Sequence, residues 1–319
     1  STLDIFTHSP YGYYSYSRAN DRSIYVDIMA NISKQWTDLS FIANVGSAFT
    51  HTSYDITGFQ GGLKPPSNLF TPNAIDYSRV SGDNRPIFDL TRHAIHSVLG
   101  SVELGWQEKV YLTVTGRNDW DSSLSNTAQQ SFFYPSVGMS AILSKMLKLP
   151  AFVDFLKFRT SWASVGSAIS PNISSAWRYE YIPSTGTYHT VTYKFPDNFY
   201  PERTNSLEAG VTATLFKEAL SVKFTLYQSN TKNQTFLRQI TLGGAYNREY
   251  IQAGNVRNRG LELTVGYNKK WTDCRWSVNM SYSMNHNRIV RLLDNPNETL
   301  RQGGLNGCEV ILTQGGTMG

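Results

Sequence analysis

Leu220-Ser-Val-Lys-Phe-Thr-Leu-Tyr227 alternates apolar and polar residues without a break. In a β-strand, successive side chains point to opposite faces, so Leu220, Val222, Phe224 and Leu226 would share one face. The residues between them would share the other face. This pattern predicts a strand that separates an apolar environment from a polar one.

The same alternation marks ten predicted strands along the chain. They span 23–33, 38–50, 94–107, 110–118, 136–144, 156–166, 205–216, 220–231, 257–268 and 274–288. Several contain about 11 residues or more, near the roughly 9–11 that cross a bilayer at a tilt. Strands of soluble proteins typically contain about 5–6 residues. The lengths therefore favour membrane-crossing strands.

The connections between these strands are alternately short and long. The short connections are 34–37, 108–109, 217–219 and 269–273, and the long ones are 51–93, 119–135, 167–204 and 232–256. Outer-membrane barrels have short turns on the periplasmic side and long loops on the outside. We therefore predict an all-β fold, a transmembrane antiparallel up-and-down β-barrel.

Composition agrees with this fold class. Charged residues make up 17% of the chain and aromatic residues 13%, whereas an average soluble domain is about 25% charged. No segment reaches the roughly 18 consecutive apolar residues of a membrane helix. The formal net charge is +5, but lysine and arginine are scattered along the chain, so no nucleic-acid partner is expected.

Aromatic residues gather near the predicted strand ends, where a membrane interface would lie. Those next to the short turns are Trp36, Trp106, Phe216, Trp271 and Trp276, and those toward the opposite ends are Tyr134 and Tyr227. Amphipathic rings anchor at the level of the lipid headgroups. We therefore interpret all seven as aromatic girdles, although ordinary hydrophobic packing gives a similar pattern.

Charged residues within the predicted strands share the polar phase. These residues are Glu103, Arg117, Lys157, Arg159, Glu208, Lys223 and Glu262. An arginine or lysine facing lipid near the midplane would cost about 2–4 kcal/mol, which explains the shared phase. Lumenal ion pairs, contacts to a plug and contacts to solute are all compatible with this placement.

No motif for covalent chemistry is present. A phosphate-binding glycine loop, a zinc-protease motif and a Gly-x-Ser-x-Gly elbow are all missing from the sequence. His93 and His96 are three residues apart, which places them on opposite faces of a strand. Asp119 and Asp121 could suggest a glycosidase acid pair, but Asx-turn chemistry at a strand exit is the more direct interpretation. We therefore predict no enzyme activity, no cofactor and no metal site.

Particular motifs resemble those of one transporter group. They are Leu112-Thr-Val-Thr-Gly-Arg-Asn-Asp-Trp120, Ser131-Phe-Phe-Tyr-Pro-Ser-Val-Gly138, Leu156-Lys-Phe-Arg-Thr-Ser-Trp-Ala-Ser-Val-Gly166, Pro201-Glu-Arg-Thr-Asn-Ser-Leu-Glu-Ala-Gly210, Tyr227-Gln-Ser-Asn-Thr-Lys-Asn-Gln234, Gly254-Asn-Val-Arg-Asn-Arg-Gly-Leu-Glu262 and Asn279-Met-Ser-Tyr-Ser-Met-Asn-His-Asn287. In this order they resemble the barrel of the SusC/RagA family of TonB-dependent outer-membrane transporters. Asp121 stands where relatives often have serine.

This resemblance implies more than the residues do alone. Such transporters have a 22-stranded barrel, a plug domain, a TonB-contacting segment and a surface lipoprotein of the SusD type. Residues 1–319 are then expected to form part of one barrel domain, about ten strands, with the plug domain and the TonB box outside this chain. The implied function is TonB-dependent import of nutrient oligomers across the bacterial outer membrane, together with a SusD-like lipoprotein. Oligosaccharides are the first expected cargo and peptides the second.

Two other classes of protein give a similar alternation. One is an outer-membrane β-barrel enzyme of the surface-protease type, and the other is a soluble β-sandwich that binds carbohydrate. In the transporter interpretation, aromatic residues in the long loops are candidate contacts to solute, because their faces stack on sugar rings. The candidate solute contacts are Trp120, Tyr188, Tyr193 and Tyr246.

Overall fold

A computed structural model describes residues 9–77, 85–125, 127, 129–167, 177–182, 187–194, 200–239, 248–293, 295, 299–302 and 310–318. Ten long strands dominate it: β1 (Tyr13–Gln35), β2 (Leu39–Gly62), β3 (Arg85–Trp106), β4 (Val110–Asp121), β5 (Ser131–Ile142), β6 (Val153–Ser167), β9 (Glu202–Leu215), β10 (Leu220–Gln239), β11 (Arg248–Lys270) and β12 (Arg275–Arg291). Shorter strands are β7 (Trp177–Ile182), β8 (Thr187–Lys194), β13 (Leu300–Gln302) and β14 (Val310–Leu312).

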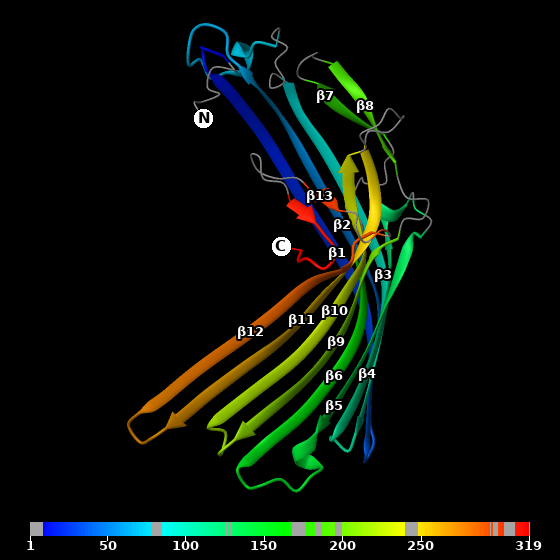
Figure 1. The fold of residues 1–319 in the computed structure, drawn as a ribbon, viewed down its shortest axis with the longest axis vertical. Coiled ribbons are helices and arrows are strands. Elements are labelled where there is room, and N and C mark those ends of the chain that lie inside the picture. Colours follow the sequence, from blue (N-terminus) through cyan, green and yellow to red (C-terminus); the bar gives the residue numbers. More distant parts are fainter. Residues whose placement is uncertain are drawn as a thin grey trace.

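The ten long strands form one curved sheet in which each strand is antiparallel to its neighbours (Figure 1). The order follows the chain, except that β6 pairs with β9 because the β7–β8 hairpin leaves the sheet. The end of β8 returns to pair with β11 in parallel. Among the described residues, β1 pairs with β2 alone and β12 with β11 alone, so these two strands form the edges of the sheet.

Tight turns join the strands at one end, the lower end of Figure 1. In the turn from Trp106 to Lys109, Gln107 and Glu108 have positive φ and the Lys109 N–H donates to the Trp106 carbonyl at 2.8 Å. Two successive positive φ values give the type I′ turn that matches strand twist. Lys145 donates to Glu108 at 2.9 Å. This hydrogen bond, together with the lysine charge, lowers the pKa of Glu108.

All ten predicted strands are present, but most are longer than predicted. The predicted strand 38–50 continues to Gly62, and the predicted strand 94–107 begins at Arg85. About half of the long connection predicted at 51–93 is therefore strand. Alternation weakens beyond the apolar rows because both faces of the strand meet water there. The long connection predicted at 167–204 also contains two strands, β7 and β8.

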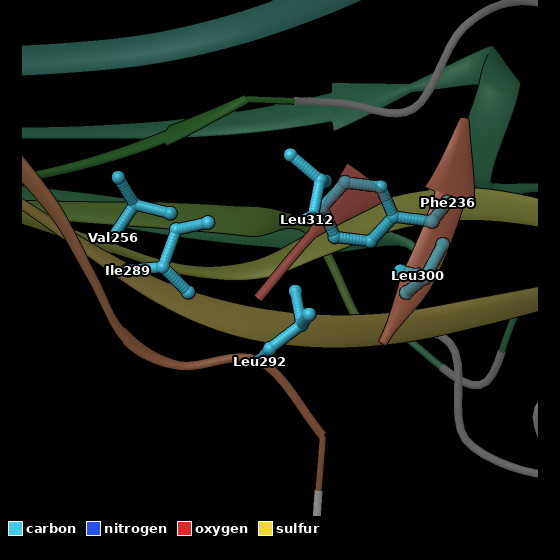
Figure 2. Close-up of a cluster of buried hydrophobic side chains, with 6 residues drawn as sticks. All are labelled: Phe236, Val256, Ile289, Leu292, Leu300 and Leu312. Carbon is cyan, nitrogen blue, oxygen red and sulfur yellow. The ribbon is translucent and has the colours of Figure 1, made fainter. Parts of the chain in front are cut away.

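Two small apolar clusters lie at the end of the sheet opposite the tight turns. In the larger, Phe236, Val256 and Ile289 pack with Leu292, Leu300 and Leu312, which joins β10–β12 to the β13–β14 hairpin (Figure 2). The smaller cluster contains Leu63, Ala74 and Ile75. Most apolar strand residues are outside these clusters, as Ile28 at 75% and Met280 at 61% exposure show. No helix among the described residues is long and apolar enough to cross a membrane.

Candidate functional site: the polar face of the sheet

Strand register keeps the two phases of alternation on separate faces. On β10, Leu226 pairs with Ala209 and Leu261, whereas its neighbour Thr225 pairs with Gly210 and Glu262. A one-residue slip would exchange the faces, so one register is strongly favoured. The side that carries the predicted lumenal charges is called the polar face below, and the other side the apolar face.

One row of the polar face crosses all ten long strands. Its members are successive cross-strand partners: Asn31, Asn44, Ser101, Thr115, Ser136, Ala163, Ser206, Ser229, Asn258 and Asn287. Apart from Ala163, each has a neutral hydroxyl or amide. We name this row the amide–hydroxyl row. It starts near the tight turn on β1 and lies far from it on β12, as expected for tilted strands.

Hydrogen bonds connect several members of the amide–hydroxyl row. Asn31 donates to Asn44, and Asn44 donates to Ser101 at 3.1 Å. Thr115 and Ser136 share a hydrogen bond of 2.6 Å. Asn287 donates to Asn258 at 2.9 Å. Hydroxyls and amides can both donate and accept, so the row can bind polar groups of either kind without a net charge.

An arginine crosses the polar face beside this row. Arg159 forms an ion pair with Glu208 at 2.9 Å and donates to Thr225 at 3.0 Å. It passes over Gly210, where an added Cβ would lie 2.8 Å from its Nε atom. Of the roles left open for the polar-phase charges, Arg159 and Glu208 therefore show ion pairing between adjacent strands, and a glycine provides the space for it.

We expect Gly210→Ala to displace Arg159 and to lower stability by about 1 kcal/mol, because a half-exposed ion pair and a hydrogen bond are both weakened. The thermal midpoint of the detergent-solubilised full-length protein measures the effect. Gly138→Ala is the matched control, since an added Cβ there meets no atom closer than 3.8 Å. Equal midpoints for the two variants would contradict the role given to Gly210.

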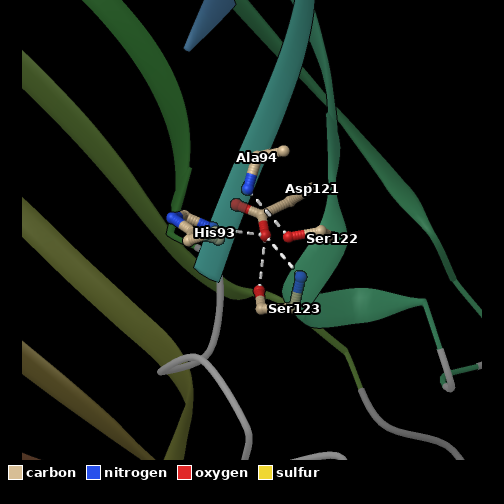
Figure 3. Close-up of polar contacts among 5 residues, drawn as sticks. All are labelled: His93, Ala94, Asp121, Ser122 and Ser123. Carbon is tan, nitrogen blue, oxygen red and sulfur yellow. Dashed lines mark hydrogen bonds and ion pairs between the residues drawn. The ribbon is translucent and has the colours of Figure 1, made fainter. Parts of the chain in front are cut away.

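The end of β4 carries a second group of polar contacts. Arg117 donates to Asp119 at 2.6 Å and to the buried Ser97 at 2.9 Å. Asp121 Oδ1 accepts from the Ser123 N–H at 2.8 Å and from the Ser123 hydroxyl at 2.6 Å, and lies 2.7 Å from His93 Nε2 (Figure 3). These contacts hold the chain where β4 passes into the short turn Ser122–Leu124.

The interpretation of Asp121 as an Asx-turn residue is confirmed, because its side chain caps this turn. Asp119 has a different role, an ion pair with Arg117. The two histidines lie on opposite faces as predicted: His93 contacts Asp121, whereas His96 stacks on Trp120 at 5.7 Å between ring centroids. The described residues include no group of three or more side chains that could hold a metal ion.

A family model described as "TonB dependent receptor-like, beta-barrel" matches residues 2–306. The chain belongs to this family. TonB-dependent receptors P3 and P26 of Formosa agariphila are each 26% identical to it, over 70% and 64% of this chain. The chain spans about a quarter of the length of these relatives, 24% of P3 and 21% of P26.

Solved structures share the fold. A structure of the RagAB peptide transporter matches 94% of this chain and 33% of its own, with a TM-score of 0.73 and 17% identity. The ferric-catecholate import receptor Fiu from K12 E. coli matches 89% of this chain and 39% of its own, with a TM-score of 0.55 and 13% identity. The sequence predicted a TonB-dependent receptor with a RagA-like β-barrel fold, and this prediction is confirmed. The family belongs to the outer membrane and is one of transport proteins rather than enzymes.

The aromatic side chains of this TonB-dependent receptor chain divide between the faces. Trp36, Trp271 and Trp276 beside the tight turns are at least half exposed, as a girdle requires. The girdle prediction was wrong for Tyr134, which pairs with Arg117 on the polar face. It was also wrong for Tyr227, whose hydroxyl donates to Asn285 on the same face.

The four residues predicted to contact solute have different positions. Trp120 is 45% exposed and shares the phase of Leu112 and Val114 on the apolar face. Tyr188 and Tyr193 belong to β8, but their side chains are outside the described part of the structure. Tyr246 lies outside the described residues altogether. Contact with solute stays a prediction for all four.

Proposed function

We propose that this chain forms part of the wall of an outer-membrane importer that takes up neutral nutrient oligomers, first of all oligosaccharides. In this proposal a SusD-like surface lipoprotein delivers the cargo, and TonB supplies the energy through a plug domain encoded outside residues 1–319. Family membership supports the transport class. The alternatives of a surface protease and a soluble β-sandwich disagree with that family.

The amide–hydroxyl row carries the proposal for the cargo. A sugar oligomer presents many neutral hydroxyl groups, and each can donate and accept as the row can. The nearby arginines Arg117 and Arg159 are already paired with carboxylates. A neutral cargo can therefore contact this wall without removing a charge from its partner, which would be costly.

Peptides are the second candidate cargo. The RagAB structures are described as a peptide transporter and importer, and their fold resembles that of this chain. A peptide also presents neutral backbone donors and acceptors, which the amide–hydroxyl row could bind. Its charged termini and side chains would need charged partners, which a neutral amide or hydroxyl does not supply.

We expect Asn44→Leu combined with Asn258→Leu to reduce oligosaccharide uptake about fivefold or more, because each lost hydrogen bond contributes about 1 kcal/mol. Uptake is measured in cells whose chromosomal copy has been replaced by the full-length variant. Asn118→Leu is the matched control, since Asn118 pairs with Val98 and Phe133 on the apolar face.

Growth of a deletion strain on glycans or on peptides as sole nutrient separates the two cargo classes. A growth defect confined to peptides would replace the oligosaccharide proposal with the peptide one. Unchanged uptake of both classes in the double variant would contradict any contact between cargo and the amide–hydroxyl row. The co-purifying surface proteins of the wild-type receptor identify the lipoprotein partner.

A further inference from the structure

The apolar face of β10–β12 changes from apolar to basic side chains between two successive cross-strand rows. Leu226, Leu261 and Met284 are cross-strand partners and form the last fully apolar row. The next row toward the long loops is Gln228, Arg259 and His286, and the row after that is Asn230, Arg257 and Arg288. Because short turns face the periplasm in such barrels, these basic rows lie on the side of the outer leaflet.

An apolar groove lies against the first of these basic rows. Its volume is about 460 Å³. Leu207, Ala209, Leu226, Leu261 and Met284 line it, and Arg259 and His286 form its polar end. The small side chain of Ala209 leaves room between its larger neighbours. Since these side chains are on the apolar face, the groove opens toward lipid.

A cationic pocket of about 420 Å³ adjoins the groove and shares Arg259 and His286 with it. Arg257 and Arg288 add two further guanidinium groups, and Gln314 and Gly315 close one side. The segment that contains Gly315 is held by backbone hydrogen bonds to Ile289. Three arginines and a histidine therefore converge on one hollow.

These arginines differ from those of the polar face in their partners. Arg259 donates to the side-chain Oε1 of Gln228 at 2.6 Å, and Arg257 donates to the side-chain Oδ1 of Asn230 at 2.8 Å. Among the described residues, no carboxylate forms an ion pair with Arg257, Arg259 or Arg288. An arginine has five N–H donors, so most of their donors remain available to an anion.

On β4, β5 and β6, the apolar face carries aromatic rings at a similar distance from the tight turns. Trp120, Phe133 and Trp162 are 45%, 52% and 42% exposed on the same face. Rings at this level are the usual interfacial anchors of a barrel. β11 and β12 differ from these three strands because their cations line one pocket next to an apolar groove.

We infer that the groove and the cationic pocket together bind a phosphate-bearing lipid of the outer leaflet. The phosphate lies among Arg257, Arg259 and Arg288, because guanidinium groups match phosphate oxygens in charge and geometry. An acyl chain lies in the groove beside Ala209, where it covers apolar surface. Basic pockets on membrane proteins bind anionic headgroups for the same reasons.

The test uses the full-length receptor in neutral detergent, with three separate probes: bisphosphorylated lipid A, its chemically dephosphorylated form and inorganic phosphate. Bound lipid is counted by native mass spectrometry, and stabilisation is followed by thermal unfolding. We expect bisphosphorylated lipid A to bind and to raise the unfolding midpoint. We expect Arg257→Gln and Arg288→Gln each to weaken binding about tenfold, since each removes charge-assisted hydrogen bonds.

Two further variants complete the design. Ala209→Phe fills the groove with an apolar side chain and should also weaken lipid binding while leaving the fold intact. Lys269→Gln is the control, because Lys269 is exposed on the same strand and face but lies beside the tight turn. It should bind like the wild type.

Equal protection by inorganic phosphate and by bisphosphorylated lipid A would overturn the lipid assignment. Equal binding of the dephosphorylated lipid would overturn the role of the arginines. Unchanged binding in Ala209→Phe would contradict the placement of the acyl chain. None of these outcomes bears on cargo uptake, so this inference and the proposed function can fail independently.

Discussion

Val265→Arg is expected to prevent or severely weaken assembly of the receptor in the membrane. Val265 pairs with Val222 and Met280 near the middle of the apolar rows of β10–β12. An arginine on the lipid face costs about 2–4 kcal/mol at the bilayer midplane. That cost is a large fraction of the stability of a typical domain.

Thr264→Arg provides the matched control because Thr264 is the adjacent residue on the polar face, where it pairs with Lys223 and Ser281. We expect a much smaller effect, since its side chain meets water. Heat-modifiable migration on gels and denaturant unfolding of the full-length protein in lipid vesicles measure both variants. A loss for Thr264→Arg as large as that for Val265→Arg would mean that the faces are assigned the wrong way round.

The second large effect is expected for Asp121→Ala. The Asp121 side chain is 1% exposed. It accepts hydrogen bonds from the Ser123 N–H and the Ser123 hydroxyl, and it contacts the His93 ring. Its removal leaves buried donors without an acceptor, and we expect a local loss of about 2–4 kcal/mol. The sheet itself should remain, because its ladders do not involve this side chain.

Hydrogen exchange of residues 121–125 and of the start of β3 measures this loss directly. Asp121→Asn keeps a carbonyl acceptor for Ser123 and removes only the charge beside His93, so it should open less than Asp121→Ala. Faster exchange in both variants to the same extent would show that the charge, rather than the hydrogen bonds to Ser123, holds the turn. Unchanged exchange in Asp121→Ala would contradict the capping role.

Sequence alternation predicted the strands because one face of each meets a different medium from the other. The same signal could not show that β2 continues to Gly62 or that β3 begins at Arg85. Residues such as Thr57 and Leu90 lie beyond the apolar rows, where the alternation is weak. The alternation did indicate the correct face for Tyr227, because this residue is in phase with Lys223 and Thr225 on the polar face. The girdle interpretation used only its position near a strand end, and that choice caused the error.

The candidate sites required information that a single sequence does not contain. Asn44 and Asn258 are 214 positions apart, from 258 − 44, and only the pairing of successive strands places them in one row. The same holds for Arg257 and Arg288, which become neighbours through the β11–β12 register. The Asp121 turn could be predicted because its partner Ser123 is local.

The tight turns at one end of the sheet have a consequence for how such receptors can diversify. Each turn fixes the register of the hairpin it closes, and the apolar and polar faces fix the register between neighbouring hairpins, so the pairing of the wall is determined without the opposite end. Segments inserted between β2 and β3 or between β6 and β9 then leave the amide–hydroxyl row and the apolar rows in place. The β7–β8 hairpin is one such insertion, and the ladder between β6 and β9 continues beside it. Outer surfaces can therefore be exchanged among relatives while the wall that crosses the membrane stays the same.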